Sequence, residues 1–287
     1  MRLGVTYNVF NGAELLKPSI LTVRLLSHHI VVVYSVKSIT GEDAPKWLVP
    51  LLNGLKKDGL VDTLIEVVHP LFSDSLKIQR EKRMKYELGR KRCMEMGCTH
   101  HMGRDVDEFF DTGQLRNVLD LFEHKDMVLC PLYDYINQPT TRARQTSPLH
   151  VTAFHKAGLH YEPKKCPVLM DMSRTVVSKS VKVLKENQLV MHHMTGVRYN
   201  QVERDRKFQG HSHFNLTGKG NRDKFIENIT NPSAQSFVIV PDRFGVLDYW
   251  QKEFGRIYGG QDHGFNDHDT SKTSSGDERS ESVGRPS

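Results

Sequence analysis

The chain has no long hydrophobic run and few cysteines. No stretch of about 18 apolar residues occurs among its 287 residues, so no transmembrane helix is expected. The N-terminus also lacks a separate apolar region with a cleavage site, and residues 3–9 are expected to form the first strand instead. The four cysteines show no C-x-x-C spacing, which favours reduced thiols. These absences together predict a cytoplasmic protein.

Two further absences limit the classes of function. A nucleotidyltransferase normally has a glycine-rich phosphate loop near its first strand, and Asn11-Gly12 is too short to provide one. That class is nevertheless kept as the alternative enzyme. The aromatic residues do not interleave with the basic clusters, so a surface for single-stranded nucleic acid is not expected. A non-catalytic carbohydrate- or nucleic-acid-binding protein is the remaining alternative.

The charge of the chain is unevenly distributed. The net charge is +6, but residues 260–287 hold six acidic and three basic residues, which leaves 37 Lys and Arg against 28 Asp and Glu, or +9, in the rest. A basic body of this kind suits a phosphorylated small molecule as ligand. The Gly, Ser, Asp and Thr content from residue 259 onward predicts that 259–287 is a disordered polar tail.

The first half of the chain alternates between strand and helix patterns. The run 30–34 is apolar throughout, as expected of a parallel strand covered on both faces. Together the segments predict a mostly parallel α/β sheet flanked by helices. The expected strands are 3–9, 30–34, 61–68 and 98–102, and the expected helices are 12–26, 44–57 and 73–96. The second half is less regular: strands are expected at 127–136, 188–195 and 236–241, a polar loop at 137–147, a mixed stretch at 199–232 and a closing helix at 247–257.

Two carboxylates follow the expected strand at 98–102. Asp105 and Asp107 stand at positions i and i+2, so both can turn toward one divalent cation. Mn²⁺ and Mg²⁺ prefer such oxygen ligands and can also hold a diphosphate. Because ligands of parallel α/β sheets bind at the carboxyl ends of strands, Asn8 and Tyr34 are expected at the same edge. A buried arginine is costly unless it is paired, so the strand is expected to end before Arg104.

Several blocks occur in an order that resembles a known family. The chain is similar to the GT-A glycosyltransferases, in particular to the family 2-like members of phages and bacteria, and the likeness spans roughly residues 3–215. The blocks are Tyr7-Asn8-Val9-Phe10-x-Gly12-x-Glu14-Leu15-Leu16, Val31-Val32-Val33-Tyr34, Lys85-x-x-x-Gly89, Gly97-Cys98-Thr99-His100, Asp105-Val106-Asp107-Glu108 and the HHxSxVR-like Met191-His192-His193-Met194-Thr195-x-Val197-Arg198.

The resemblance implies a GT-A, Rossmann-like domain over residues 1–258. A nucleotide-sugar-binding half would occupy 1–125, and a less regular acceptor half would occupy 126–258. It implies a metal-dependent glycosyltransferase that uses Mn²⁺ or Mg²⁺ and moves a sugar from a nucleotide-diphosphate donor to a glycan or other hydroxyl-bearing acceptor. Neither nucleic acid nor a membrane span is implied as a partner.

The resemblance also implies the metal ligands. Asp105 and Asp107 would hold the cation against the donor diphosphate, and a histidine from a later strand would complete the set. Adjacent side chains on a strand face opposite ways, so only one of His192 and His193 can enter the site. His193 is the predicted ligand, and His192 is expected to pack on the other face. Glu108 is expected to orient the metal loop.

Donor contacts are predicted at five positions. Lys85 and Arg198 are candidates for the phosphates, because positive groups stabilise a leaving group as its charge develops. The alternatives are a solvated helix face for Lys85 and a structural salt bridge for Arg198. Thr6 and Asn8 end the first strand where GT-A proteins hold base and ribose, and Tyr34 is a candidate to stack on the base. Ordinary strand-end hydrogen bonding and core packing are the alternatives for these three.

An inverting transferase also needs a base near the acceptor hydroxyl. Asp171 follows an apolar run and is the first candidate, and Asp134 is the second. The alternative for both is an aspartate that caps a turn.

Overall fold

Four parallel strands form the centre of the molecule. The computed structural model describes residues 1–38, 41–68, 75–162, 168–170, 174–199 and 237–257. Strand β2 is paired on both edges and its residues Val31, Val32 and Val33 are fully buried, as a strand with two covered faces requires. The four strands lie in the order β4-β1-β2-β3 and comprise β1 (Leu3–Val9), β2 (Ser27–Tyr34), β3 (Thr63–Glu66) and β4 (His100–Asp105).

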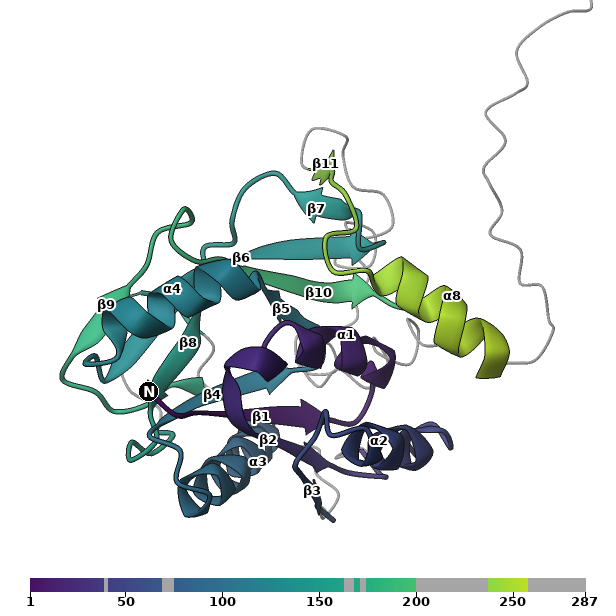
Figure 1. Cartoon of the computed structure of the whole chain (residues 1–287), viewed down its shortest axis with the longest axis horizontal. Coiled ribbons are helices and arrows are strands. Elements are labelled where there is room, and N and C mark those ends of the chain that lie inside the picture. The colour runs from purple at the N-terminus through teal and green to yellow at the C-terminus, as the bar shows by residue number, and fades with distance from the viewer. Residues whose placement is uncertain (39–40, 69–74, 163–167, 171–173, 200–236, 258–287) are drawn as a thin grey trace, which may run out of the picture.

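Further strands extend the sheet beyond β4. The long β6 (Met127–Asn137) is joined to β4 through the antiparallel β8 (His150–Lys156). At its far end β6 pairs in parallel with β10 (Met191–Val197), which in turn pairs with the antiparallel β5 (Glu108–Phe110). The remaining described strands are β7 (Thr141–Ala143), β9 (Val181–Val183) and β11 (Phe237–Ile239). The expected α/β class, with a mostly parallel central sheet flanked by helices, is confirmed (Figure 1).

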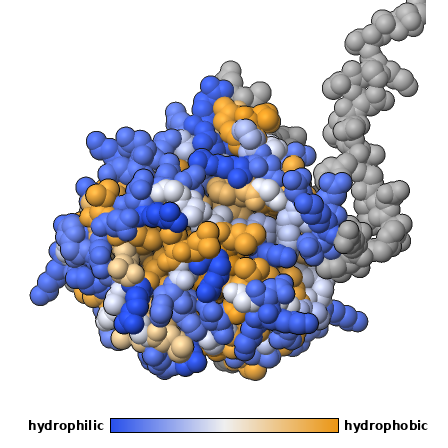
Figure 2. Space-filling model, in the orientation of Figure 1, coloured by the Kyte–Doolittle hydropathy of each residue, from blue (hydrophilic) through white to orange (hydrophobic). Residues whose placement is uncertain are grey.

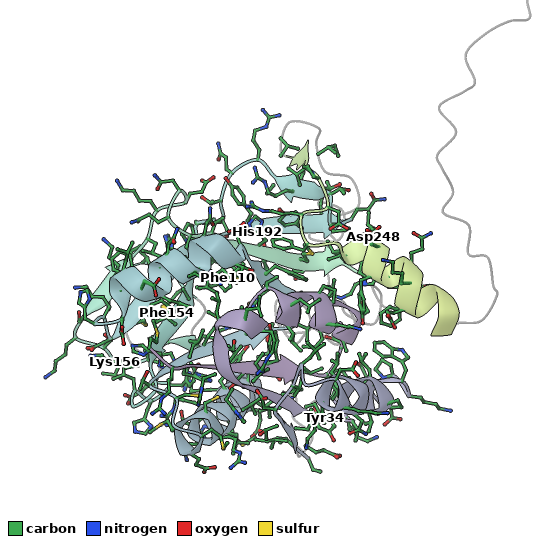
Figure 3. The ribbon with its side chains drawn as sticks, in the orientation of Figure 1. Tyr34, Phe110, Phe154, Lys156, His192 and Asp248 are labelled. Carbon is green, nitrogen blue, oxygen red and sulfur yellow. The ribbon has the colours of Figure 1, made fainter. Side chains whose placement is uncertain are left out.

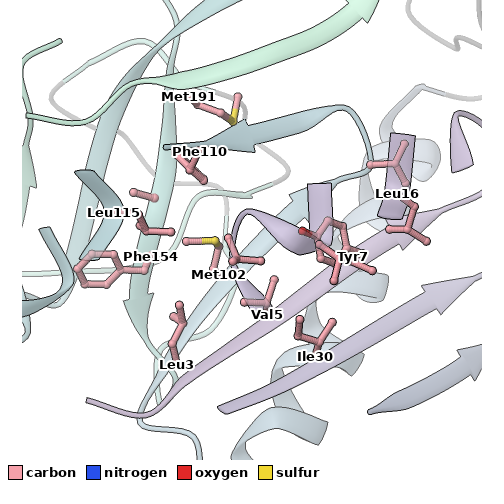
Figure 4. Packing of buried hydrophobic residues seen from close by; sticks show 14 of the residues in the cluster. Leu3, Val5, Tyr7, Leu16, Ile30, Met102, Phe110, Leu115, Phe154 and Met191 are labelled. Carbon is pink, nitrogen blue, oxygen red and sulfur yellow. The ribbon is translucent and has the colours of Figure 1, made fainter. Parts of the chain in front are cut away.

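Helices cover both faces of the central strands. Successive strand residues point to opposite faces, and the odd-numbered residues of β1 pack in the main core with one set of helices (Figure 4). These are α1 (Leu16–Leu21), α2 (Leu48–Lys57) and α4 (Thr112–Phe122). The long α3 (Ser75–Glu95) covers the opposite face. Helix α8 (Val246–Ile257) packs separately, with Trp250 and Phe254 against residues of β6 and β10.

Helix α3 approaches the sheet unusually closely. A Cβ atom on Gly89 of α3 would lie 2.2 Å from two side-chain atoms of Thr6 on β1. A Cβ atom on Gly4 would likewise lie 2.5 Å from Cβ of Cys93. Glycine at these two positions therefore lets the backbones of α3 and β1 meet.

Two local expectations differ from the structure. The helix expected at 12–26 is divided into η1 (Ala13–Leu15), α1 and η2 (Arg24–Leu26). Pro18 lies in the first turn of α1, where its missing N–H is tolerated, and the Thr22 hydroxyl donates back to the Ser19 carbonyl at the helix end. The polar loop expected at 137–147 contains β7, which pairs with β6 and β11.

The expectation that a strand ends before Arg104 was wrong. Strand β4 continues to Asp105, and the Arg104 side chain is fully buried. Its guanidinium donates to the Tyr7 hydroxyl at 3.1 Å, to Thr22 Oγ1 at 3.3 Å and to the Glu108 carbonyl. The guanidinium also lies over the rings of Tyr7 and Phe110, at 5.4 and 5.0 Å from their centroids, so neutral hydrogen-bond acceptors and aromatic faces hold the buried charge.

Other expected features have simpler outcomes. Helix α4, for which Asp111 is the N-cap and accepts from the Gln114 amide at 2.9 Å, was not expected from the sequence. The stretch 200–232 and the tail 259–287 lie outside the described residues. No helix in the described ranges is both long and apolar enough to span a membrane.

On the face shown in Figure 2, apolar surface gathers over α1 and at β11, where Leu21 and Ile239 are exposed.

The close approach of α3 predicts a size limit at Gly89. Gly89→Ala would force its Cβ into Thr6 and should lower the free energy of unfolding by about 1–3 kcal/mol. Urea unfolding followed by circular dichroism measures this change. Gly54→Ala in α2, where an added Cβ meets open space, is the matched control and should stabilise by up to about 1 kcal/mol. Equal unfolding midpoints for the two variants would contradict the close contact.

Candidate active site

Strand pairing brings the acidic loop after β4 next to β10. Strand β10 lies between β5 and β6, and its residue His193 pairs with Glu108 on one side and with Asp134 on the other. The amide of Met194 also donates to the Asp107 carbonyl at 2.7 Å. Residues about 60 to 90 positions apart along the chain therefore meet at the carboxyl end of β4, as the rule for parallel α/β sheets predicts.

Asp107 is one of the nearly fully buried carboxylates of this site. Its side chain is 1% exposed, and Oδ2 accepts from Nη2 of Arg198 at 3.1 Å. Its other oxygen, Oδ1, lies 3.9 Å from Nε2 of His193. Arg198 is equally buried, and its Nε lies 3.8 Å from the Glu14 carboxylate. The guanidinium of Arg198 thus lies between two buried acids and pairs with both.

His193 faces Asp107, whereas His192 faces away, as the alternation of side chains along a strand predicts. Nδ1 of His193 lies 2.8 Å from Oδ1 of Asp134. Burial lowers the pKa of His193, but the hydrogen bond to Asp134 and the charge of Asp107 outweigh it and raise the pKa above its ordinary value. His192, which is labelled in Figure 3, is buried against Phe244 and hydrogen-bonds through Nδ1 to the Tyr135 hydroxyl at 2.8 Å.

Arg174 joins the remaining two carboxylates of the acidic loop. It donates to Asp105 at 2.9 Å and forms an ion pair with Glu108 at 2.5 Å. The Tyr86 hydroxyl of α3 donates to Asp105 at 2.7 Å. Oε2 of Glu108 accepts from the Asp105 amide at 3.1 Å, so Glu108 braces the loop as expected. Burial raises the pKa of Glu108, and Arg174 partly offsets that shift.

Lys85 lies on the sheet-facing side of α3, and not on the solvated face that was its alternative. It is 4% exposed, and its ammonium group donates to Ser35 Oγ, just beyond β2, at 3.1 Å. Burial, and next the charge of Lys82, lower the pKa of Lys85 to about 8, although Asp105 acts in the opposite direction. Few negative charges therefore compensate for the burial of the Lys85 ammonium.

The three donor positions predicted on β1 and β2 lie in different surroundings. Asn8 pairs with Asp105 in the β1–β4 register and is beside the acidic loop. Thr6 is fully buried below α3 and bonds through its hydroxyl to Nε2 of His101 at 2.8 Å. The Tyr34 ring belongs to the main core, and its hydroxyl donates to Glu66 at 3.2 Å. The structure therefore groups Asn8 with the acidic loop and gives Thr6 and Tyr34 partners elsewhere.

These side chains do not by themselves form a complete metal-binding group. No group of three or more His, Cys, Asp or Glu residues within the described ranges is arranged to hold an ion. Asp107 Oδ1 and His193 Nε2 are nevertheless spaced so that one cation fits between them, because two ligands at about 2.1 Å can be at most about 4.2 Å apart. Asp105 lies beside them but is engaged by Tyr86 and Arg174. Asp171, the first candidate base, lies outside the described residues.

Sequence reasoning gave no role to three residues of this site. Arg174 and Tyr86 hold the acidic loop, and Glu14 holds Arg198. Glu14 stands in the first of the family-like blocks, two residues after Gly12, and that position was its signal. Arg174 and Tyr86 had no local signal, because their partners are distant in the sequence.

Comparison with known proteins gives only slight similarities. No protein-family model and no curated protein sequence matches the chain. The crystal structure of S. aureus TarS 1–349 is 10% identical over 80% of this chain and 71% of that chain, with a TM-score of 0.43. TarS 1–349 in complex with UDP-GlcNAc is 7% identical over 80% and 72%, with a TM-score of 0.45. Mannose-1-phosphate geranyltransferase from Thermus thermophilus is 11% identical over 55% and 50%, with a TM-score of 0.28. Similarity at this level assigns no substrate, so function has to be inferred from the side chains of the site.

The buried pairing of Arg198 predicts a large stability effect. Arg198→Met leaves Asp107 and Glu14 buried without their cation and should lower the free energy of unfolding by about 3–5 kcal/mol. Arg243→Met removes an exposed ion pair with Asp111 and should cost at most about 1 kcal/mol. Chemical denaturation of both variants measures the difference. Similar losses would show that Arg198 is not the counter-ion of the site.

The lowered pKa of Lys85 predicts a pH effect of known sign. Between the folded pKa of about 8 and the ordinary value of 10.5, the unfolded chain binds more protons, so stability contributed by this group rises with pH. At neutral pH the buried ammonium is destabilising, and Lys85→Met should be the more stable protein. The difference in unfolding free energy between Lys85→Met and the wild type should narrow by about 3 kcal/mol as the pH rises through that range. Unfolding free energies measured from pH 7 to about pH 10.5 test this, and a pH-independent gap would contradict a buried lysine with a depressed pKa.

Proposed function

We propose that the chain is a metal-dependent glycosyltransferase that moves a sugar from a nucleotide-diphosphate donor to a hydroxyl-bearing acceptor. The observation that carries the proposal is the facing pair of Asp107 and His193 at the carboxyl end of the parallel strands. The sequence blocks that resemble the GT-A family imply Asp105, Asp107 and His193 as metal ligands, and this pair is two of those three. The arrangement of the blocks in space therefore supports the same conclusion as their order in the sequence.

The cation is proposed to be Mn²⁺ or Mg²⁺, held by Asp107 and His193 with Asp105 beside them. When bound, it would neutralise the charge of the departing nucleoside diphosphate. Arg198 holds Oδ2 of Asp107 and leaves Oδ1 turned toward His193. Through Glu108 and Tyr86, the protein fixes the loop that carries both aspartates. A fixed loop adds no reorganisation cost when the donor binds.

Lys85 and Asn8 are the proposed donor contacts of the protein itself. The Lys85 ammonium is buried and has a depressed pKa, so a diphosphate placed near it would restore its preference for the charged form. Asn8 offers an amide at the strand end next to Asp105. Arg198 is proposed to act through Asp107, because its guanidinium is already engaged by Asp107 and Glu14. Thr6 and Tyr34 are left out of this donor set because the structure packs them elsewhere.

Nucleotide-sugar binding tests the proposal. A panel of UDP-, GDP- and CMP-sugars, with and without Mn²⁺, should include one nucleotide that raises the melting temperature in a Mn²⁺-dependent way, because a ligand of the folded state stabilises it by mass action. Asp107→Asn should abolish that shift and the release of nucleoside diphosphate. Asp120→Asn, an exposed aspartate of α4, is the matched control and should behave as the wild type. A folded protein that responds to none of the donors would contradict the proposal.

A further inference from the structure

The hydrogen bond between Asp134 and His193 determines which nitrogen of the imidazole points into the site. Strands β6 and β10 run in parallel with these two residues paired, so their side chains lie next to each other. Oδ1 of Asp134 lies 2.8 Å from Nδ1 of His193, the separation of a strong charge-assisted hydrogen bond. A carboxylate only accepts, so Nδ1 must carry the hydrogen.

A neutral His193 with its hydrogen on Nδ1 presents a lone pair at Nε2. That lone pair faces Oδ1 of Asp107 at 3.9 Å, which is too long for a hydrogen bond. Arg198 holds the other Asp107 oxygen at 3.1 Å and so prevents the carboxylate from turning away. Oδ1 of Asp107 and Nε2 of His193, which both carry lone pairs, are thereby held pointing at each other. This arrangement is favourable when a positive ion lies between them.

We infer that Asp134 is a positioning residue, which fixes His193 in the Nδ1–H form and directs Nε2 at Asp107. The inference rests on the proposed function, because the proposed cation is the reason for Nε2 to point at Asp107. It also changes the role of Asp134 from the predicted acceptor base to an outer partner of a ligand. The position suits this role, because a histidine that binds metal usually donates its other N–H to a carboxylate or carbonyl oxygen.

Two substitutions separate positioning from packing. Asp134→Ala removes the acceptor and should let His193 exchange between its two neutral forms or rotate. Asp134→Asn keeps the shape of the side chain but replaces the carboxylate by an amide, whose NH2 can donate to Nδ1 and so favours hydrogen on Nε2. Asp120→Ala on α4 controls for the loss of a negative charge at a distance. Urea unfolding of each variant shows that the comparison is between folded proteins.

The first readout needs neither metal nor activity. Imidazole ¹H–¹⁵N spectra of the metal-free protein, recorded at alkaline pH where His193 is neutral, should show hydrogen on Nδ1 in the wild type and a shift of hydrogen to Nε2 in Asp134→Asn. The same spectra should show a mixture in Asp134→Ala. The second readout is Mn²⁺ affinity by calorimetry. Asp134→Ala and Asp134→Asn should bind Mn²⁺ about 10–100-fold more weakly, whereas Asp120→Ala should stay close to the wild type.

Each result has a distinct meaning. Hydrogen on Nε2 in the wild type, or an unchanged spectrum in Asp134→Ala, would overturn the positioning role. The expected spectra together with an unchanged Mn²⁺ affinity in Asp134→Ala would overturn the inference that the positioning of His193 serves cation binding. A wild type that shows the expected spectra but binds no Mn²⁺ supports the positioning role and contradicts the proposed metal-dependent function. Failure of the inference and failure of the proposed function are therefore distinguishable.

Discussion

Buried arginine–carboxylate pairing is the interaction on which the rest of this site depends. Four carboxylates, from Glu14, Asp105, Asp107 and Glu108, gather where the central strands end, and each would be costly to hold near the others without a cation. Arg198 and Arg174 each bridge two of them. The loop after β4 therefore has a defined shape, because its charges are satisfied from two directions. A ligand that enters meets groups that are already aligned.

The same pairing ties the two halves of the chain together. The acids come from the first half, whereas Arg174, Arg198 and His193 come from the second. Strand β10 makes this possible by lying between β5 and β6, so its residues are registered against both halves. The site is consequently a product of the whole sheet and not of one segment. An Asp-x-Asp sequence is a weak signal by itself, and it gains weight once these distant partners are in place.

Much of this arrangement follows from the sequence, and the exceptions have physical causes. Apolar runs and strand order predicted the central sheet, and side-chain alternation predicted the opposite directions of His192 and His193. The early end assigned to β4 failed because the partners of Arg104 are the side chains of Tyr7 and Thr22, which no local pattern reveals. Thr6 and Asn8 point to the same face of β1, but only the structure shows that α3 covers one of them. The role of Arg174 was not predicted for a similar reason, since its partners lie about 70 residues away in the sequence.

The last described helix has a consequence for how the protein is made. Trp250 of α8 donates from Nε1 to the Glu14 carbonyl at 3.0 Å, across 236 residues of sequence. Glu14 in turn lies beside Arg198, so this part of the site is closed by a segment 236 residues further along the chain. Strands β1 to β4 can pair once they have left the ribosome, whereas the contact between Trp250 and Glu14 must wait until α8 has been synthesised. A nascent chain stalled before α8 would therefore carry the central strands without the contact that covers Glu14.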